Sequence, residues 1–89
     1  MRAVITVIGK DMVGILARVS TICAGHGVNI VEVTQSVLQD LFAMIMLCEI
    51  DKCDIPFERL AALLTKEGED MGLSILAMHE DIFNSMHRV

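Results

Sequence analysis

Two spacings of hydrophobic residues divide the chain into strands and helices. Short β-branched runs that stop at a glycine or at polar residues predict strands, whereas apolar residues that recur every three or four positions predict the buried side of a helix. The predicted strands are residues 3–8, 28–38, 41–50 and 73–79. Gln39 and Asp40 lie where a tight turn would join the second strand to the third.

Helices are predicted between and after these strands. The first has Asp11 as its expected N-cap and Gly27 as the residue expected just past its end. Its apolar side consists of Ile15, Leu16, Val19, Ile22, Cys23 and His26. Pro56 suits the first turn of the second helix, which Gly72 ends, with Gly68 as an earlier candidate end.

The second helix and the tail of the chain each have an apolar side. On the second helix this side consists of Phe57, Leu60, Ala61, Leu64 and Met71. Residues 80–88 are predicted to form a short amphipathic helix that carries Ile82, Phe83 and Met86 on one side. An exposed Phe–Met stripe would invite aggregation, so we expect these three side chains to be buried on the core or on a partner subunit.

The order of elements predicts the fold class. The sequence β-α-β-β-α-β is the split βαβ unit of α+β, ferredoxin-like folds, in which two helices cover one face of a four-stranded antiparallel sheet. Right-handed crossovers put the first and third strands in the centre of the sheet. The nearly continuous apolar run of 41–50 suits a central strand, and the polar residues interleaved in 28–38 suit an edge. We expect one domain at 1–79 and a helical tail at 80–89.

Composition indicates a partner subunit. The 89 residues are 54% hydrophobic but include only three aromatics, so aliphatic residues and seven methionines must fill the core. The mean hydropathy is +0.60, which indicates more apolar surface than one small monomer easily buries. We therefore predict a homodimer, in which the edge strand 28–38 joins the same strand of a second copy.

Charge and cysteine content exclude several function classes. Seven basic residues against twelve acidic ones give a net charge of −5, and the cations are scattered, which disfavours nucleic acid and anionic membranes as partners. The longest apolar run, 41–48, is far too short to span a bilayer, and no signal peptide precedes the first strand. Three cysteines are an odd number and favour reduced thiols in the cytoplasm.

Two polar features are candidate ligand contacts. Residues 9–16 end a central strand and open a helix, whose first N–H groups can receive a carboxylate or phosphate, and Gly14 lets a ligand approach the backbone. The alternative is that Gly9 and Gly14 only shape a turn. Asn29, at the start of the second strand, offers amide donors and acceptors to an amino acid, or it caps its own backbone.

Metal binding and catalysis have little support in the sequence. Cys23 and His26, three residues apart, and Cys48 and Cys53, five apart, do not form the paired four-ligand pattern of a structural zinc site. We expect Cys23 and Cys48 to be small buried hydrophobes, and Met44, Met46 and Met78 to fill the core. We predict neither a metal nor a cofactor. His79 and His87 are expected at a strand end and in the solvated tail.

Residues 7–16, with the sequence VIGKDMVGIL, resemble the strand–loop–helix signature of ACT domains. Residues 26–30, HGVNI, resemble the Gly-x-Asn-Ile start of their second strand, and the resemblance covers about residues 3–79. The resemblance is closest to small stand-alone ACT proteins, a group similar to the glycine cleavage system repressor, and the tail of these small proteins also resembles residues 82–89.

This resemblance implies a regulatory domain that binds an amino acid or a similar small ligand at a subunit interface. Carried over by position, the residues that enclose the ligand would be Asp11, Met12, Gly14, Ile15, Leu16 and, from the second strand, Asn29. ACT domains usually regulate an attached enzyme, and this chain carries no catalytic domain. Any output would therefore pass through another protein, an enzyme or regulator that the chain controls.

Two other functions compete with a dimeric, non-catalytic ligand sensor. The same fold without a small ligand would be a protein–protein interaction or dimerisation module. A small ferredoxin-like enzyme such as acylphosphatase would need an Arg and an Asn around a Gly-rich phosphate loop, and this loop contains Lys10 but no Arg. We expect no enzyme.

Overall fold

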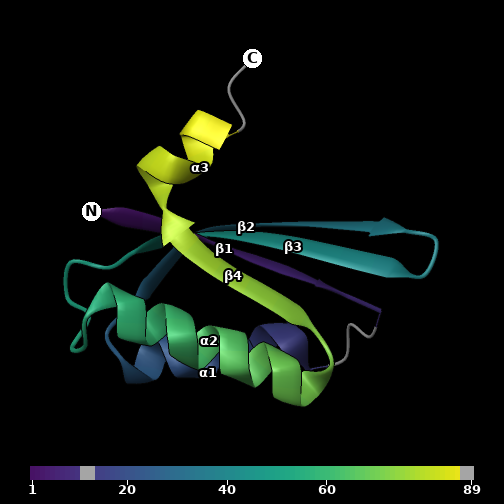
Figure 1. Cartoon of the computed structure of the whole chain (residues 1–89), viewed down its shortest axis with the longest axis horizontal. Helices are drawn as coiled ribbons and strands as arrows, with labels where there is room; N and C mark the ends of the chain where they lie inside the picture. The colour runs from purple at the N-terminus through teal and green to yellow at the C-terminus, as the bar shows by residue number, and fades with distance from the viewer. Residues whose placement is uncertain (11–13, 87–89) are drawn as a thin grey trace.

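The computed structural model describes residues 1–10 and 14–86, and within these residues the chain has the predicted order of elements (Figure 1). The elements are β1 (Arg2–Gly9), α1 (Ile15–Gly25), β2 (Asn29–Leu38), β3 (Leu41–Glu49), α2 (Phe57–Met71), β4 (Ser74–His79) and α3 (Glu80–Met86). The predicted α+β, ferredoxin-like fold is confirmed. Predicted strand ends differ from the observed ones by at most one residue.

The sheet has the strand order β2-β3-β1-β4, and all neighbouring strands are antiparallel. The central position of the first and third strands is therefore confirmed. β1 pairs with β3 from Arg2 opposite Glu49 to Gly9 opposite Phe42. β2 is an edge strand, and its pairing with β3 shifts by one residue between Ile30 and Glu32, so that Val31 has no partner in the ladder.

Helices α1 and α2 lie on one face of the sheet, and α3 lies on the other (Figure 1). The hydrophobic core fills the space between the sheet and the two long helices. Alternate strand residues point into it, and the largest fully buried side chains are Ile5, Ile15, Met44, Met46, Leu60, Leu64 and Ile75. Met44 and Met46 are core residues as predicted, whereas Met78 is only partly buried.

The sheet face away from α1 and α2, here called the outer face, keeps much apolar surface in contact with solvent. Its exposed large hydrophobic side chains are Ile8, Leu41, Ile45 and Leu76. α3 covers only one end of this face, where Phe83 lines a hollow together with Val4 and Leu47. Exposed apolar surface, which the composition led us to expect, is therefore present, and four of the eleven exposed large hydrophobic residues in the described part of the chain lie on the outer face.

An ion pair and the Phe83 side chain join α3 to the sheet. Arg2 of β1 forms a two-pronged ion pair with Glu80, with Nε to Oε1 at 3.0 Å and Nη2 to Oε2 at 2.7 Å. Ile82 and Met86 stay exposed, and Phe83 is half-buried. The expectation that the tail packs on the core is therefore wrong for Ile82 and Met86 within one chain, because the helix stands out from the sheet. Burial on a partner stays a prediction.

Both long helices end in the same backbone motif. Gly27 and Gly72 adopt positive φ angles of 76° and 74°. After α1 the Val28 N–H donates to the Cys23 carbonyl at 2.8 Å, and after α2 the Leu73 N–H donates to the Gly68 carbonyl at 2.7 Å. These are Schellman motifs, and they confirm both predicted helix ends.

One predicted helix boundary, the N-cap of α1, is wrong, and the alternative end of α2 at Gly68 is excluded. Gly14, at a φ of 75°, is the N-cap of α1, so the expected cap Asp11 is not the capping residue and lies outside the described residues. α2 runs through Gly68 to Met71 and does not end at Gly68. Gly68 is buried instead, because a Cβ there would lie 2.8 Å from Ile75 Cγ1 and 3.1 Å from both the Ile75 nitrogen and the Leu73 oxygen.

We predict that Gly68→Ala destabilises the protein, although alanine favours a helix by about 1 kcal/mol over glycine. The added methyl group must push against β4 backbone, and overpacking of this kind costs about 1–3 kcal/mol. Gly25→Ala is the matched control, because Gly25 is also helical and nothing lies within 4 Å of its Cβ position. Thermal unfolding should show a lower Tm for Gly68→Ala and an equal or higher one for Gly25→Ala. Equal behaviour of the two variants would contradict this packing role.

Candidate functional site

The predicted ligand loop begins where β1 ends. Gly9 is the last residue of β1, and a Cβ there would overlap the Leu73 side chain, so close packing accounts for this glycine. Gly14 has open space around its Cβ position, and its positive φ accounts for glycine there. The turn-forming alternative therefore has structural support at Gly14, whereas packing against Leu73 and not a turn explains Gly9. Asp11 and Met12 lie outside the described residues.

Among the described residues, no side chain caps the first N–H groups of α1. Gly14 has no side chain to cap them, and the first turn contains no acidic residue. Such a helix end attracts anions through its free N–H groups and the helix dipole. The Ile15 side chain is buried in the core, so only its backbone faces this end, while Leu16 is 41% exposed on the surface.

Arg18, in the first turn of α1, forms an ion pair with Glu67, so the two side chains together add no net charge beside this end of α1. The Nε of Arg18 donates a hydrogen bond to Glu67 Oε1 of α2 at 2.9 Å, which joins the start of α1 to the end of α2. An open hollow of about 480 Å³ lies beside this ion pair and is lined by Gly14, Ala17, Arg18, Thr21, Ile22 and Glu67. We call this region the Gly14 end.

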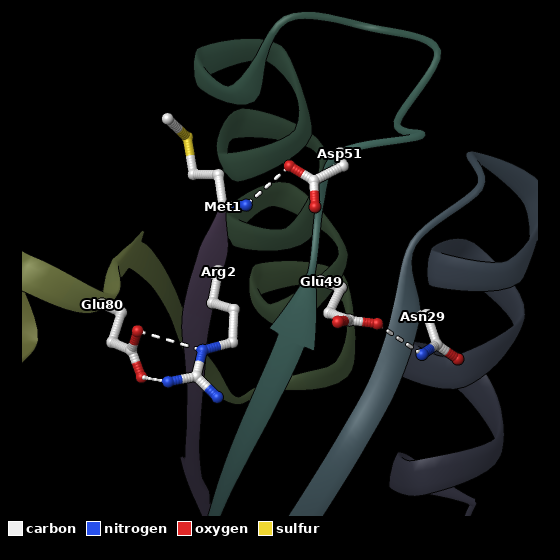
Figure 2. A network of polar contacts seen from close by, with 6 residues as sticks. All are labelled: Met1, Arg2, Asn29, Glu49, Asp51 and Glu80. Atoms are coloured by element: carbon white, nitrogen blue, oxygen red, sulfur yellow. Dashed lines mark hydrogen bonds and ion pairs between the residues drawn. The ribbon is translucent and has the colours of Figure 1, made fainter.

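Asn29 lies in a second polar region, at the start of β2. Its side-chain Nδ2 donates to Glu49 Oε1 of β3 at 3.0 Å, and Figure 2 shows the two side chains meeting between neighbouring strands. A hollow of about 220 Å³ is lined by Gly27, Asn29, Glu49, Asp51 and Lys52. We call this region the Asn29 end. The alternative that Asn29 caps its own backbone is not the contact observed, because its amide bonds to Glu49.

The wall of this hollow is held against α1 by the loop after β3. The Asp54 N–H donates to the His26 carbonyl at 3.0 Å, and Asp54 Oδ1 lies 2.8 Å from His26 Nδ1. Gly27 approaches the Lys52 carbonyl so closely that a Cβ would overlap it. Only glycine therefore allows the loop to close over the end of α1. His26, predicted on the apolar side of the helix, is a half-buried partner of this loop.

One chain does not bring Gly14 and Asn29 together. β2 runs parallel to β1, so Asn29 lies at the end of the sheet where β1 starts. Gly14 comes after the last residue of β1, just before α1, and so belongs to the opposite end of the sheet. α1 separates them, and its 11 residues span roughly 16 Å at 1.5 Å per residue. A ligand that touches both must therefore lie between two chains.

The cysteines are accounted for by packing. Cys23 and Cys48 are fully buried in the core, as predicted, and Cys53 is a partly buried loop thiol. A hydrogen bond to Cys23 together with burial raises the pKa of the Cys48 thiol, which keeps it protonated. Within residues 1–10 and 14–86, no three His, Cys, Asp or Glu side chains converge as metal ligands. His79 ends β4 and stacks on Phe57, with ring centroids 4.3 Å apart.

The sequence patterns did not identify Arg18, Glu49 or Glu67. Arg18 and Glu67 are 49 residues apart, and Asn29 and Glu49 are 20 apart, so each pair is visible only once helix packing or strand register is known. The one local signal was Glu49, the first charged residue after the long apolar run of β3. A membrane-crossing role has no support in the described part of the chain, where no helix is long and apolar enough to span a bilayer.

Comparison with known proteins gives a consistent match. The family model of the ACT domain matches residues 2–77. A UPF0237 protein of Methanopyrus kandleri is 46% identical over 88 residues, which are 99% of this chain and 98% of that protein. A UPF0237 protein of Clostridium acetobutylicum is 45% identical over 89 residues, the full length of both chains.

Solved structures agree in fold. An ACT domain protein from Streptococcus pneumoniae superposes with a TM-score of 0.81 at 35% identity and covers 93% of each chain. A candidate glycine cleavage system transcriptional repressor superposes with a TM-score of 0.71 at 24% identity, over 86% of this chain and 44% of that one, which shows the shared fold. The predicted resemblance is confirmed, and the chain belongs to the ACT domain family.

Proposed function

We propose that this chain is a non-catalytic sensor that binds an amino acid or a similar small ligand at a dimer interface and acts on a partner protein, an enzyme or regulator. ACT domains are regulatory ligand-binding modules, which supports the general role. The observation that carries the proposal is the pair of hollows that Gly14 and Asn29 line, the first along α1 beside the Arg18–Glu67 ion pair and the second at the start of β2. Each offers part of a ligand site, and a second copy would join them.

Pairing of two β2 strands supplies the required arrangement. β2 is an edge strand, and two of its valines are exposed to solvent. About half of the surface of Val31 and slightly more than half of that of Val37 is accessible. A two-fold axis beside β2 makes the two edges antiparallel and continues the sheet, which also removes an exposed edge. The same axis sets the two α1 helices antiparallel, so the Gly14 end of one chain faces the Asn29 end of its partner.

The ligand would bridge these ends. Its carboxylate accepts hydrogen bonds from the free N–H groups at Gly14 and the residues after it, and the partner's Asn29 orients the remaining polar group. Asp11, Met12, Ile15 and Leu16 would form the rest of the loop. We assign this work to residues 1–79 and treat 80–89 as a tail. We further propose a cytoplasmic protein without nucleic-acid or membrane partners, in keeping with its net charge of −5.

A ligand-free interaction module is the second candidate, favoured by one observation. The apolar residues of the outer face and of α3 stay exposed in the single chain, and such a surface can serve a protein partner without any small molecule. The two functions differ in whether an amino acid stabilises the fold.

We predict a dimer at micromolar concentration that charges on the β2 edge disrupt. Val31→Lys combined with Val37→Lys places like charges opposite each other across the two-fold axis and should reduce the mass measured by light scattering to that of a single 9.8 kDa chain. Lys substitution at exposed Leu63 of α2, away from the edge, is the control and should leave the dimer intact. A wild-type mass of 9.8 kDa would contradict the dimer itself.

We predict that at least one of the common amino acids raises the Tm. A ligand at about 100 times its Kd stabilises the fold by about 2.7 kcal/mol, which corresponds to roughly 10–20 °C for a domain of this size. A thermal-shift screen at millimolar concentrations measures this directly. If no amino acid shifts the Tm, the ligand-free module replaces the sensor as the favoured function.

Two substitutions test the site residues by calorimetry. Asn29→Ala should weaken binding by up to about tenfold, because one hydrogen bond contributes about 0.5–1.5 kcal/mol. Gly14→Ala should weaken it further by placing a methyl group in the ligand's approach to the backbone. Gly72→Ala is the matched control, since Gly72 has the same positive φ and the same open space but does not line either hollow. Equal affinity of the Gly14 and Gly72 variants would refute the Gly14 contact.

A further inference from the structure

A hollow on the outer face, between the sheet and α3, takes no part in the proposed sensor site. We call it the α3 hollow. Its volume is about 210 Å³, and it shares no lining residue with the hollows at the Gly14 end and the Asn29 end. At roughly 30 Å³ for each group the size of a water molecule, it has room for a ligand of about seven non-hydrogen atoms.

The strand register puts a charged residue at one end of an apolar row in this hollow. Leu47 of β3 pairs with Glu32 of β2 on one side and with Val4 of β1 on the other. Paired residues share a face, and neighbouring strands lie about 4.8 Å apart, so Glu32 and Val4 are roughly 10 Å apart across the sheet. Phe83 of α3 lines the hollow with all three. A linear alkyl chain with a polar end fits such a row.

The charge at this end of the outer face is negative on balance. Glu80 also lines the hollow, but Arg2 neutralises it through the two-pronged ion pair (Figure 2). Glu32 forms no ion pair among the described residues, and Glu49, in the neighbouring row, is bonded by the neutral amide of Asn29. Two carboxylates therefore keep their charge here, and they attract a cationic group and repel an anionic one.

We propose that the α3 hollow binds a linear aliphatic amine of about four to six carbons, with its ammonium at Glu32 and its alkyl chain on Val4 and Leu47 beside Phe83. Thr34 lies two residues from Glu32 on the same face, and its hydroxyl oxygen accepts a second N–H. Burial of the chain supplies affinity, and the carboxylate supplies the preference for a cation. All the lining residues belong to one chain, so amine binding requires neither the dimer nor the proposed sensor site.

The probes are three molecules with the same five-carbon chain and different charge: n-pentylamine, n-pentanol and pentanoate. They are titrated into the isotope-labelled full chain at neutral pH and constant ionic strength, and binding is followed by the NMR shifts of backbone amides. The amine should shift amides at Glu32, Leu47 and Phe83 in a saturable way. It should bind about fivefold more tightly than the alcohol, as expected for a partly exposed ion pair, and pentanoate should bind most weakly.

Two substitutions separate charge from packing. Glu32→Gln keeps the shape of the side chain without its charge, so the amine should fall to the affinity of the alcohol, and the alcohol should change by less than about twofold. Phe83→Ala removes apolar surface and should weaken amine and alcohol alike. Glu69→Gln is the matched control for charge, because Glu69 is an exposed residue of α2 outside the hollow, and it should keep the preference. Circular dichroism establishes that each variant is folded.

Three outcomes overturn the proposal. If n-pentylamine in the tens of millimolar shifts no amide of the hollow, there is no amine site. If its shifts follow exposed carboxylates over the whole surface, the amine only screens the net charge of −5. If Glu32→Gln keeps the preference for the amine over the alcohol, Glu32 does not select the cation. Each of these results leaves the proposed function standing, since amino-acid binding is tested by a separate thermal-shift screen.

Discussion

The pairing of β1 with β3 determines where every polar group of interest lies. These two central strands run antiparallel with their inward residues in the core, from Arg2 opposite Glu49 to Gly9 opposite Phe42. A slip of one residue would turn Ile5, Val7, Met44 and Met46 outward, so burial holds the register firmly. The register in turn sets Glu49 at one end of the sheet and the start of the Gly9–Gly14 loop at the other. α1 spans the distance between them, which makes a site shared between chains the natural solution.

Much of the fold followed from periodicity alone, because each element buries one face. The continuous apolar run of β3 indicated a central strand, and Gly27 and Gly72 marked helix ends that require a positive φ. Gly68 was considered as an alternative helix end but lies inside α2, because close packing against a neighbouring strand can require glycine as readily as a turn can. The N-cap of α1 was misassigned because a glycine filled the place where a side-chain cap was expected.

The candidate site was less predictable than the fold. Gly14 and Asn29 belong to local motifs and could be proposed from their neighbours in sequence. That they lie apart follows only from α1 between them, which is roughly 16 Å long. The contacts that give each end its charge join elements far apart in the chain, Arg18 to Glu67 and Asn29 to Glu49. Hydrophobic spacing has no information about such pairs, since exposed polar residues leave the core pattern unchanged. The sequence therefore predicted Gly14 and Asn29 as candidate site residues but did not predict the charged side chains that contact each region.

The unpaired Val31 has a consequence for the deletion of a residue from β2. Ile30 pairs with Cys48 and Glu32 with Leu47, so the ladder would be regular if Val31 were absent, and both flanking segments would keep their faces. Loss of that one residue straightens the edge strand without exchanging core and surface side chains on either side of it. Asn29 would stay opposite Glu49 after such a deletion. The chain can therefore lose one residue at a point two residues from Asn29 and keep the strand register that places Asn29 opposite Glu49.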